Sequence, residues 1–174
     1  MKIALYLGSF NPFHNGHLEV IKTALNDFKM DRVIIVPTMQ NPWKEEKVLD
    51  INKRISILRA QLQVEFFPKQ WLRIGIDNIE KFLIPPYYSY ATLHALKNKY
   101  CNDEIFVLCG EDTIKDIPNW MNGGQIIKDY DFLVVDRPKN SISSTQIRNK
   151  IKNKENINNL VEENVVDLIK RYYK

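Results

Sequence analysis

The sequence predicts an α/β fold: a doubly wound, mostly parallel sheet of five or six strands with helices on both faces. Short runs that are apolar throughout alternate with segments whose apolar residues recur at helical spacing. Strands without a polar face are typical of parallel sheets that are covered on both sides. The chain of 174 residues is long enough for one domain with a sizeable core. Because no internal repeat or linker interrupts the pattern, we expect a single domain over residues 1–174.

The first half of the chain begins with a strand and continues with alternating helices and strands. Strands are expected over 2–7, 32–37 and 71–76. Between the first two strands, apolar residues recur at spacings of 3, 4 and 3, which indicates a helix: Leu18, Ile21, Leu25 and Phe28. A second helix, with Asp50 as its expected N-cap, follows the second strand and carries the stripe Ile51, Ile55, Leu58 and Leu62.

The second half repeats this alternation. Helices are expected over 89–99, from near Ser144, and over 161–172, and strands over 104–110 and 131–136. This order favours a Rossmann-like sheet with right-handed crossovers. In such sheets ligands bind in the crevice at the carboxyl ends of the strands, so the strand-to-helix turns are where functional residues are expected.

Composition and charge narrow the class of protein. The net charge is +4 and the sequence pI about 8.9, which suits an anionic ligand. The lysines are scattered along the chain rather than gathered on one face, so we expect no nucleic-acid partner. Two cysteines indicate no disulfide framework. No apolar run has the length of a membrane span and the amino-terminal apolar stretch is too short for a signal peptide, so a cytoplasmic protein without a membrane partner is expected.

The turn after the first strand, "GSFNPFHNGH", combines residues that suit an anion. Gly8 allows a sharp turn and a close approach of backbone to a ligand. Asn15 is expected to cap the following helix, whose free N–H groups and dipole would then face the crevice. His14 and His17 lie three apart and can donate hydrogen bonds to phosphate oxygens. Half of a metal site is the alternative, which the lack of a completing ligand set disfavours.

This stretch resembles the G-x-F-x-P-x-H-x-G-H signature of the HxGH nucleotidyltransferase superfamily. In that family the two histidines contact triphosphate oxygens and stabilise charge on the α-phosphate. The resemblance therefore implies that His14 and His17 are catalytic. It also implies a mononucleotide contact from Asn11 and ATP contacts from four further residues: Gly8, Ser9, Phe10 and Gly16.

A second stretch near the carboxyl terminus, "ISSTQIR" over 142–148, resembles the superfamily's other phosphate motif, I-S-S-T-x-I-R. Hydroxyls at a helix start, with Ser143 or Ser144 as the cap, offer donors beside free backbone N–H groups. Arg148 follows on the same helix and can bind phosphate as a fork, so it is a catalytic candidate. The implied ATP contacts are Ile142, Ser143, Ser144 and Thr145. A plain helix cap with a solvated arginine would explain this motif alone; together, the two motifs predict one triphosphate site between them.

The middle of the chain is similar to the nicotinate/nicotinamide mononucleotide adenylyltransferases. The stretch 36–58 implies that Lys44 reaches the phosphates, in catalysis and mononucleotide binding, and that Arg54 contacts the mononucleotide; an exposed helix face is the alternative for Arg54. The stretch 87–96 resembles S-Y-T-x-D-T-L and implies mononucleotide contacts from Tyr88 and Ser89. Ala91 stands where that family usually has Asp, and the effect of this difference stays open.

The stretch 108–120 resembles the family's G-x-D-x(4)-L-P-x-W. It implies ATP contacts from Gly110 and Asp112. Trp120 would stack on a pyridine ring, with Met121 beside it; core packing is the alternative for Trp120. Arg137, after the fifth strand, matches a family arginine near the ATP phosphates.

The implied reaction is the joining of ATP to a nicotinate or nicotinamide mononucleotide, with release of pyrophosphate. The attacking phosphate is already an anion, so no general base is needed, and Mg²⁺ would be held by substrate phosphates rather than by protein side chains. Phosphopantetheine adenylyltransferase and the glycerol-phosphate or choline-phosphate cytidylyltransferases are rival interpretations on the same scaffold. A non-catalytic nucleotide sensor and a fragment of a class I aminoacyl-tRNA synthetase are rivals of other classes. The choice of pyridine substrate and a homo-oligomeric state stay open.

Overall fold

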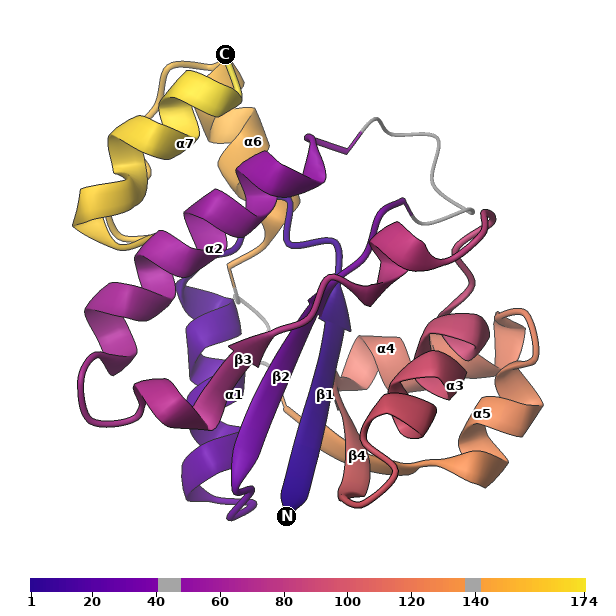
Figure 1. Cartoon of the computed structure of the whole chain (residues 1–174). Coiled ribbons are helices and arrows are strands. Elements are labelled where there is room, and N and C mark those ends of the chain that lie inside the picture. Colours follow the sequence, from indigo (N-terminus) through magenta and orange to yellow (C-terminus); the bar gives the residue numbers. More distant parts are fainter. Residues whose placement is uncertain (41–47, 137–141) are drawn as a thin grey trace.

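The computed structural model describes residues 1–40, 48–136 and 142–174. In this part of the chain five parallel strands form one sheet in the order β3-β2-β1-β4-β5 (Figure 1). The strands are β1 (Lys2–Gly8), β2 (Arg32–Pro37), β3 (Ile74–Ile76), β4 (Glu104–Gly110) and β5 (Asp131–Val135). The doubly wound parallel sheet predicted from the sequence is therefore confirmed.

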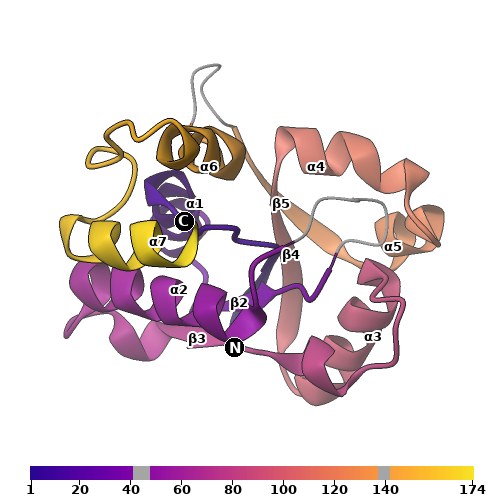
Figure 2. The ribbon, with the colours of Figure 1, turned by 90° about the horizontal axis from the view of Figure 1, so that it is seen from above.

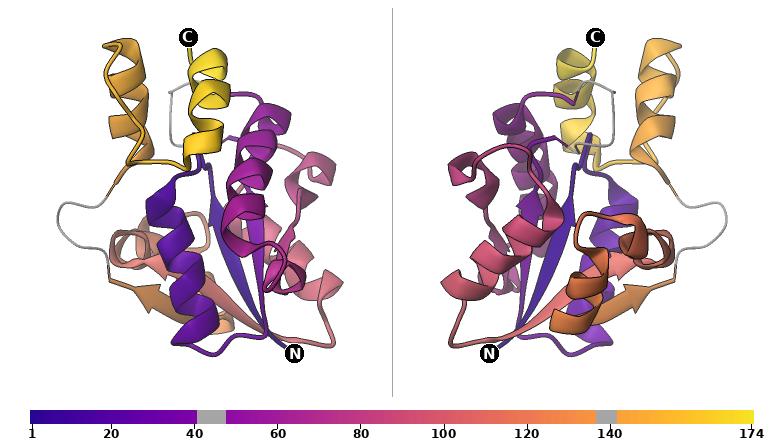
Figure 3. Two further views of the ribbon diagram at one scale, coloured as in Figure 1. Left: turned by 90° about the vertical axis from the view of Figure 1, so that its left-hand side faces the viewer. Right: turned by 90° about the vertical axis from the view of Figure 1, so that its right-hand side faces the viewer.

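Seven α-helices flank the sheet in the described residues. They are α1 (Asn15–Asn26), α2 (Ile51–Phe66), α3 (Ser89–Lys99), α4 (Glu111–Asp116), α5 (Gly123–Asp129), α6 (Ser144–Lys152) and α7 (Val166–Tyr172). Seen from above, α1, α2, α6 and α7 lie on one side of the sheet and α3, α4 and α5 on the other (Figure 2). The helices thus form the two outer layers of a three-layer domain, as the side views also show (Figure 3).

Alternation along β1 explains why both faces of the sheet are apolar. Ala4 and Tyr6 belong to the core that α1 and α2 cover, whereas Ile3 and Leu5 belong to the core beneath α3 and α5. A smaller apolar cluster joins α2 to the carboxyl-terminal segment; its buried members are Ile57, Ile147, Ile157, Val161, Val165, Val166 and Ile169. Packing within this third cluster places α6 and α7 above the carboxyl end of the sheet.

Several expected boundaries were wrong, each for a local reason. The third strand is limited to 74–76 because Trp71–Arg73 forms a turn of 3₁₀ helix. The last helix begins at Val166, after a 3₁₀ turn over Glu163–Val165, rather than at 161. Phe28 packs on the core beyond the end of α1. The short helices α4 and α5 were not predicted from the sequence, because they carry too few residues for a periodic apolar pattern.

Of the expected N-caps of α1 and α2, the one at Asp50 is confirmed and the one at Asn15 is wrong. The Asp50 side chain accepts hydrogen bonds from the backbone N–H groups of Asn52 and Lys53, so it caps α2 as expected. Asn15, in contrast, is the first residue of α1, and His14 occupies the N-cap position with extended backbone. The backbone N–H of Asn15 donates instead to the carbonyl of Leu160, at 3.0 Å. The carboxyl-terminal segment therefore accepts one of the first backbone N–H groups of α1, and the N-cap position belongs to His14 rather than to Asn15.

A buried polar side chain on α2, that of Gln61, also ties this segment to the turn after β1. The amide of Gln61 is buried; its Nε2 donates to the carbonyl of Phe13 at 2.7 Å, and its Oε1 accepts from the backbone N–H of Glu162 at 3.3 Å. A buried amide with both ends used resists replacement, since its backbone partners would lose their hydrogen bonds.

In the described residues, no helix has the length and apolar character needed to cross a bilayer.

We expect Gln61→Leu to lower the free energy of unfolding by about 1–3 kcal/mol, because two buried backbone groups lose their partner. Urea denaturation followed by circular dichroism measures this loss. Gln63→Leu, at an exposed position of the same helix, is the matched control and should change stability by less than about 0.5 kcal/mol. Equal effects from both variants would contradict the role given to Gln61.

Candidate active site

The two phosphate motifs, far apart in the sequence, are in direct contact. The hydroxyl of Ser144 donates to the carbonyl of Pro12 at 2.8 Å. Arg148 donates from Nη1 to the carbonyl of Asn11 at 2.7 Å. The amino end of α6 therefore lies against the turn that follows β1, at the carboxyl end of the sheet (Figure 1). A parallel sheet of this kind binds its ligands at that edge.

Within the histidine motif, Gly16 lies next to the segment that leads into α6. A Cβ atom added to Gly16 would lie 3.1 Å from the ring of His14 and 3.6 Å from the carbonyl oxygen of Ile142. The contact with the imidazole would be tighter than usual, whereas the one with the Ile142 carbonyl would be an ordinary van der Waals contact. Gly16 is thus a contact point between the two motifs.

The two imidazoles are more buried than the sequence suggested. The rings of His14 and His17 stack with centroids 3.7 Å apart, and the residues are 1% and 9% exposed. His17 also stacks on Phe13 and meets Phe10 edge-on, at centroid distances of 5.1 and 5.0 Å. Aromatic packing of this kind fixes the orientation of the ring. An imidazole in a fixed orientation can serve as a preorganised hydrogen-bond donor.

The helix start determines which nitrogen of His17 carries the proton. The backbone N–H of His14 donates to Nδ1 of His17 at 3.2 Å. A nitrogen that accepts a hydrogen bond carries no proton, so the proton of the neutral ring sits on Nε2. His17 can therefore donate from Nε2 toward a phosphate oxygen.

The turn itself is tightly folded. Phe10 has a φ of 45°, in the left-handed region, and its side chain lies in the core. A Cβ atom at Gly8 would lie only 3.0 Å from the ring of Phe10. A larger residue than glycine would crowd the phenylalanine ring here. Because the side chain of Phe10 is buried, its backbone is the part that can approach ATP. Ser9 lies between them and its carbonyl is used by a third residue, Arg54.

Arg54 lies behind the site rather than on an exposed helix face. It is 1% exposed, and its guanidinium donates to three backbone carbonyls: those of Ser9, at 2.5 Å, Leu49, at 2.6 Å, and Met39, at 3.2 Å. Burial lowers the pKa of Arg54, and the nearby Tyr173, Asp50 and Glu80 oppose that shift. These contacts support a role in shaping the loops after β1 and β2, in place of the direct mononucleotide contact expected from the sequence.

The side chain of Asn11 is likewise fixed by hydrogen bonds to other parts of the protein. Its side-chain oxygen accepts from the hydroxyl of Tyr173 at 2.6 Å and from the backbone N–H of Leu49 at 3.3 Å. Burial raises the pKa of Tyr173, while the charges of Arg54 and Arg148 oppose the shift. The buried side chain of Asn11 therefore links the turn after β1 to the end of the chain, and sequence reasoning gave no sign of Tyr173.

The residues expected to bind the rings of the substrates lie on the other side of the sheet. Gly110 ends β4 and caps α4, and Asp112 is exposed on the first turn of that helix. Tyr88 caps α3, and Ser89 is its first residue. The predicted ring-binding pair follows α4 in the chain: Trp120, half-buried against the core of this face, and Met121, 43% exposed.

Two predicted residues, Lys44 and Arg137, lie outside the described residues. Glu80, which was not predicted from the sequence, is a buried carboxylate that accepts hydrogen bonds from the backbone N–H of Met39 and the hydroxyl of Thr92. A single glutamate in an irregular stretch carries no pattern that would have marked it. Over the described ranges, no three His, Cys, Asp or Glu side chains are placed to hold a metal ion.

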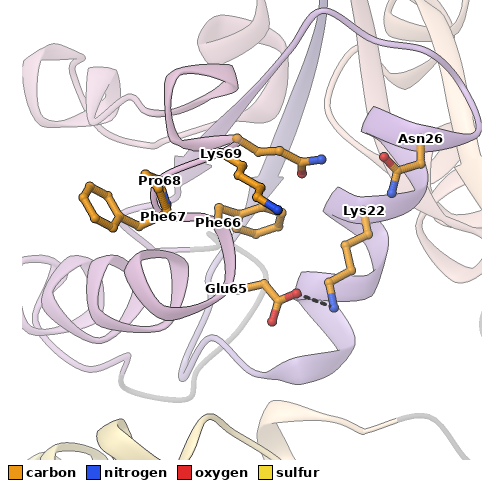
Figure 4. A pocket seen from close by; sticks show the side chains of 8 residues that line it. Lys22, Asn26, Glu65, Phe66, Phe67, Pro68 and Lys69 are labelled. Carbon is orange, nitrogen blue, oxygen red and sulfur yellow. Dashed lines mark ion pairs between the residues drawn. The ribbon is translucent and has the colours of Figure 1, made fainter.

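A separate hollow of about 340 Å³ lies at the carboxyl ends of α1 and α2 (Figure 4). Its wall includes Phe66, Phe67 and Pro68, and Lys22 at its rim pairs with Glu65 at 2.7 Å. Because parallel-sheet helices run opposite to the strands, this end of α1 and α2 is the amino edge of the sheet. None of the predicted site residues that the structure describes lines this hollow.

Comparison with known proteins places this geometry among nucleotide-processing proteins. The cytidylyltransferase-like family model matches residues 5–150. A protein of Fusobacterium nucleatum, named probable nicotinate-nucleotide adenylyltransferase, is 34% identical over 197 aligned positions, which cover 99% of both chains. A protein of Flavobacterium johnsoniae with the same name is 32% identical and covers 97% of this chain and 96% of its own.

Solved structures share the fold over almost the whole length. One from Vibrio parahaemolyticus has a TM-score of 0.81 at 21% identity and covers 99% of this chain and 94% of its own. The nicotinic acid mononucleotide adenylyltransferase of Plasmodium falciparum, solved with NaAD, has a TM-score of 0.76 at 19% identity and covers 98% and 95%.

We expect Arg54→Lys to lower the free energy of unfolding by at least about 2 kcal/mol, because an ammonium group cannot serve three carbonyls that a planar fork reaches. Thermal and urea unfolding of the purified protein measure the effect. Arg59→Lys, at an exposed position of the same helix, is the control and should leave stability within about 0.5 kcal/mol. An Arg54→Lys protein as stable as the control would show that the three hydrogen bonds contribute little.

Proposed function

The chain belongs to the cytidylyltransferase-like family and, within it, to the nicotinate-nucleotide adenylyltransferases, and from this premise we propose how its residues carry out adenylyl transfer. It is a nucleotidyltransferase enzyme that uses nucleotide substrates. The proposed reaction joins ATP to nicotinate mononucleotide and releases pyrophosphate. One observation carries the assignment of the site: Ser144 and Arg148 contact the backbone of the turn that holds His14 and His17. A triphosphate at this junction would meet both motifs.

Catalysis here requires donors and charge rather than a nucleophile. The 5′-phosphate of the mononucleotide attacks the α-phosphate of ATP in line, and pyrophosphate leaves. Charge develops on the phosphates during this step, and we assign its stabilisation to two groups. These are the Nε2–H of His17, whose ring stacks on His14, and the guanidinium of Arg148. The amino end of α6 adds backbone N–H groups at the same place. Lys44 and Arg137 stay candidates for the same phosphates.

The two bases of the product would lie on the α3–α5 side of the sheet. Gly110 and Asp112, at the junction of β4 and α4, are assigned to ATP, with Asp112 accepting from ribose hydroxyls or the adenine amine. Trp120 is assigned to the pyridine ring, with Tyr88 and Ser89 at the start of α3, a helix that packs on the same apolar core as Trp120. The positive charge of a pyridinium favours the face of an indole.

Magnesium enters this proposal as part of the ATP substrate. The groups gathered at the junction are imidazole, guanidinium and hydroxyl groups, which suit phosphate oxygens, whereas Mg²⁺ prefers oxygen ligands. Mg²⁺ keeps water ligands and binds substrate phosphates readily, so it needs no carboxylate cage from the protein.

A cytoplasmic location also stays a prediction.

A pyrophosphate-release assay with four substrate pairs tests the function. Purified protein is given ATP with nicotinate mononucleotide, ATP with nicotinamide mononucleotide, ATP with phosphopantetheine, and CTP with glycerol phosphate. We expect turnover with ATP and a pyridine mononucleotide, and the higher kcat/KM with nicotinate. Activity only with another pair would assign the protein to a different transferase, and nucleotide binding without pyrophosphate release would indicate a sensor.

His17→Asn is expected to lower kcat about a hundredfold or more, since one transition-state donor is worth about 3 kcal/mol. The shorter amide can still accept the N–H of His14 at the position of Nδ1 but has no group at the position of Nε2. His17→Gln is the matched variant: its amide nitrogen reaches the Nε2 position, so it should keep more activity. Equal kcat values for the two variants would contradict the donor role of Nε2.

Trp120→Leu is expected to raise the KM for the mononucleotide about tenfold, because the flat aromatic face is lost while apolar bulk stays. The KM for ATP should change less than twofold. Trp71→Leu, another half-buried tryptophan that packs on the opposite core, serves as the control and should change neither KM. If Trp120→Leu shifted both KM values alike, the ring-stacking assignment would be wrong.

A further inference from the structure

Two buried, oppositely charged side chains hold the backbone of a single residue, Met39, at the exit of β2. Glu80 accepts the backbone N–H of Met39 with Oε2 at 2.6 Å, and Arg54 donates from Nη2 to the carbonyl of the same residue at 3.2 Å. Glu80 is 0% exposed, and Arg54 is similarly buried. Both polar groups of Met39 are therefore fixed, at the carboxyl edge of the sheet where ligands of this fold bind.

The second oxygen of Glu80 reaches the helix that carries the predicted mononucleotide contacts. Oε1 accepts from the hydroxyl of Thr92 at 2.7 Å, and Thr92 is fully buried in α3. The same hydroxyl lies 3.4 Å from the carbonyl of Tyr88, the cap residue of that helix. One carboxylate thus spans the gap between the exit of β2 and the start of α3.

Burial of this carboxylate is energetically costly. Burial raises the pKa of Glu80, and the hydrogen bonds from Met39 and Thr92, together with the charge of Arg54, oppose the shift. A buried charged pair is often no more stabilising than an apolar replacement of the same volume. A fixed geometry between two loops is something that an apolar side chain cannot provide, because apolar contacts are not directional.

A second buried carboxylate nearby offers a comparison. Asp77 accepts from Nζ of Lys99 at 2.7 Å and from the hydroxyl of Tyr100 at 2.8 Å, both at the carboxyl end of α3. That end of the helix points away from the phosphate junction, because α3 runs antiparallel to the strands. Asp77 therefore shares the chemistry of Glu80 but contacts the end of α3 that carries no predicted substrate residue.

We propose that Glu80 is a positioning residue for the mononucleotide half of the site. It holds Tyr88 and Ser89, at the start of α3, at a fixed place relative to the exit of β2, and it acts through Thr92 and Met39 without contacting the substrate. This inference rests on the proposed adenylyl transfer to a pyridine mononucleotide, and it adds a residue that the sequence motifs do not include.

The test compares Glu80→Ala, Glu80→Gln, Thr92→Val and the control Asp77→Asn. For each, we would measure the KM for nicotinate mononucleotide, the KM for ATP, the equilibrium binding of each substrate alone, and the free energy of unfolding. We expect Glu80→Ala to weaken mononucleotide binding about tenfold and ATP binding less than twofold. Glu80→Gln should restore most of the affinity, since its amide oxygen can accept the Met39 N–H and its nitrogen can donate to Thr92.

Thr92→Val keeps the shape of the side chain but removes the hydroxyl, so it should weaken mononucleotide binding selectively and by less than Glu80→Ala. Asp77→Asn should lower stability without changing either affinity. Thr92→Val and Glu80→Gln keep the test valid if Glu80→Ala does not fold. The proposal is overturned if these variants change both affinities alike, or change stability alone as Asp77→Asn does. A wild-type protein without pyrophosphate release would instead overturn the proposed function.

Discussion

The contact between the turn after β1 and the start of α6 is the constraint on which the rest of the site depends. Two backbone carbonyls, those of Asn11 and Pro12, accept hydrogen bonds from Arg148 and Ser144, which are more than 130 residues further along the chain. Neither motif can bind a triphosphate alone in the way proposed, because each supplies donors from one side only. The third apolar cluster keeps them together by packing α6 and α7 on α2. Folding of the carboxyl-terminal segment is therefore a condition for a complete site.

Behind the site, buried polar side chains hold backbone rather than substrate. Arg54 serves three carbonyls, Glu80 serves one N–H and one hydroxyl, and Gln61 ties the turn to the carboxyl-terminal segment. The proposed transfer uses neither a protein nucleophile nor a general base, so it depends on placing donors where charge develops. A misplacement of about 1 Å can cost such a site about a hundredfold in rate, and apolar contacts, which are not directional, do not prevent it. This difference explains why charged groups are buried here in spite of their desolvation cost.

The sequence predicted the fold well, because the apolar runs and the helical stripes report burial directly. It also predicted the cap Asp50 and narrowed the cap of α6 to Ser143 or Ser144, of which the structure selects Ser143, since such side chains act on their own helix. It did not predict that His14 takes the cap position or that Arg54 is buried, because both depend on contacts with distant segments. The partners that decide these roles, Leu160, Met39 and Glu80, follow no periodic pattern. Local signals thus gave the elements, and long-range hydrogen bonds determined what individual site residues do.

The most direct test of the central claim is a crystal structure of the protein with a non-hydrolysable ATP analogue. The account places the triphosphate between the His14–His17 pair and the amino end of α6, within hydrogen-bond distance of Nε2 of His17 and of the guanidinium of Arg148. A triphosphate bound elsewhere, or bound to the histidine motif with Arg148 and the hydroxyls of α6 more than 6 Å or so from every phosphate oxygen, would contradict it.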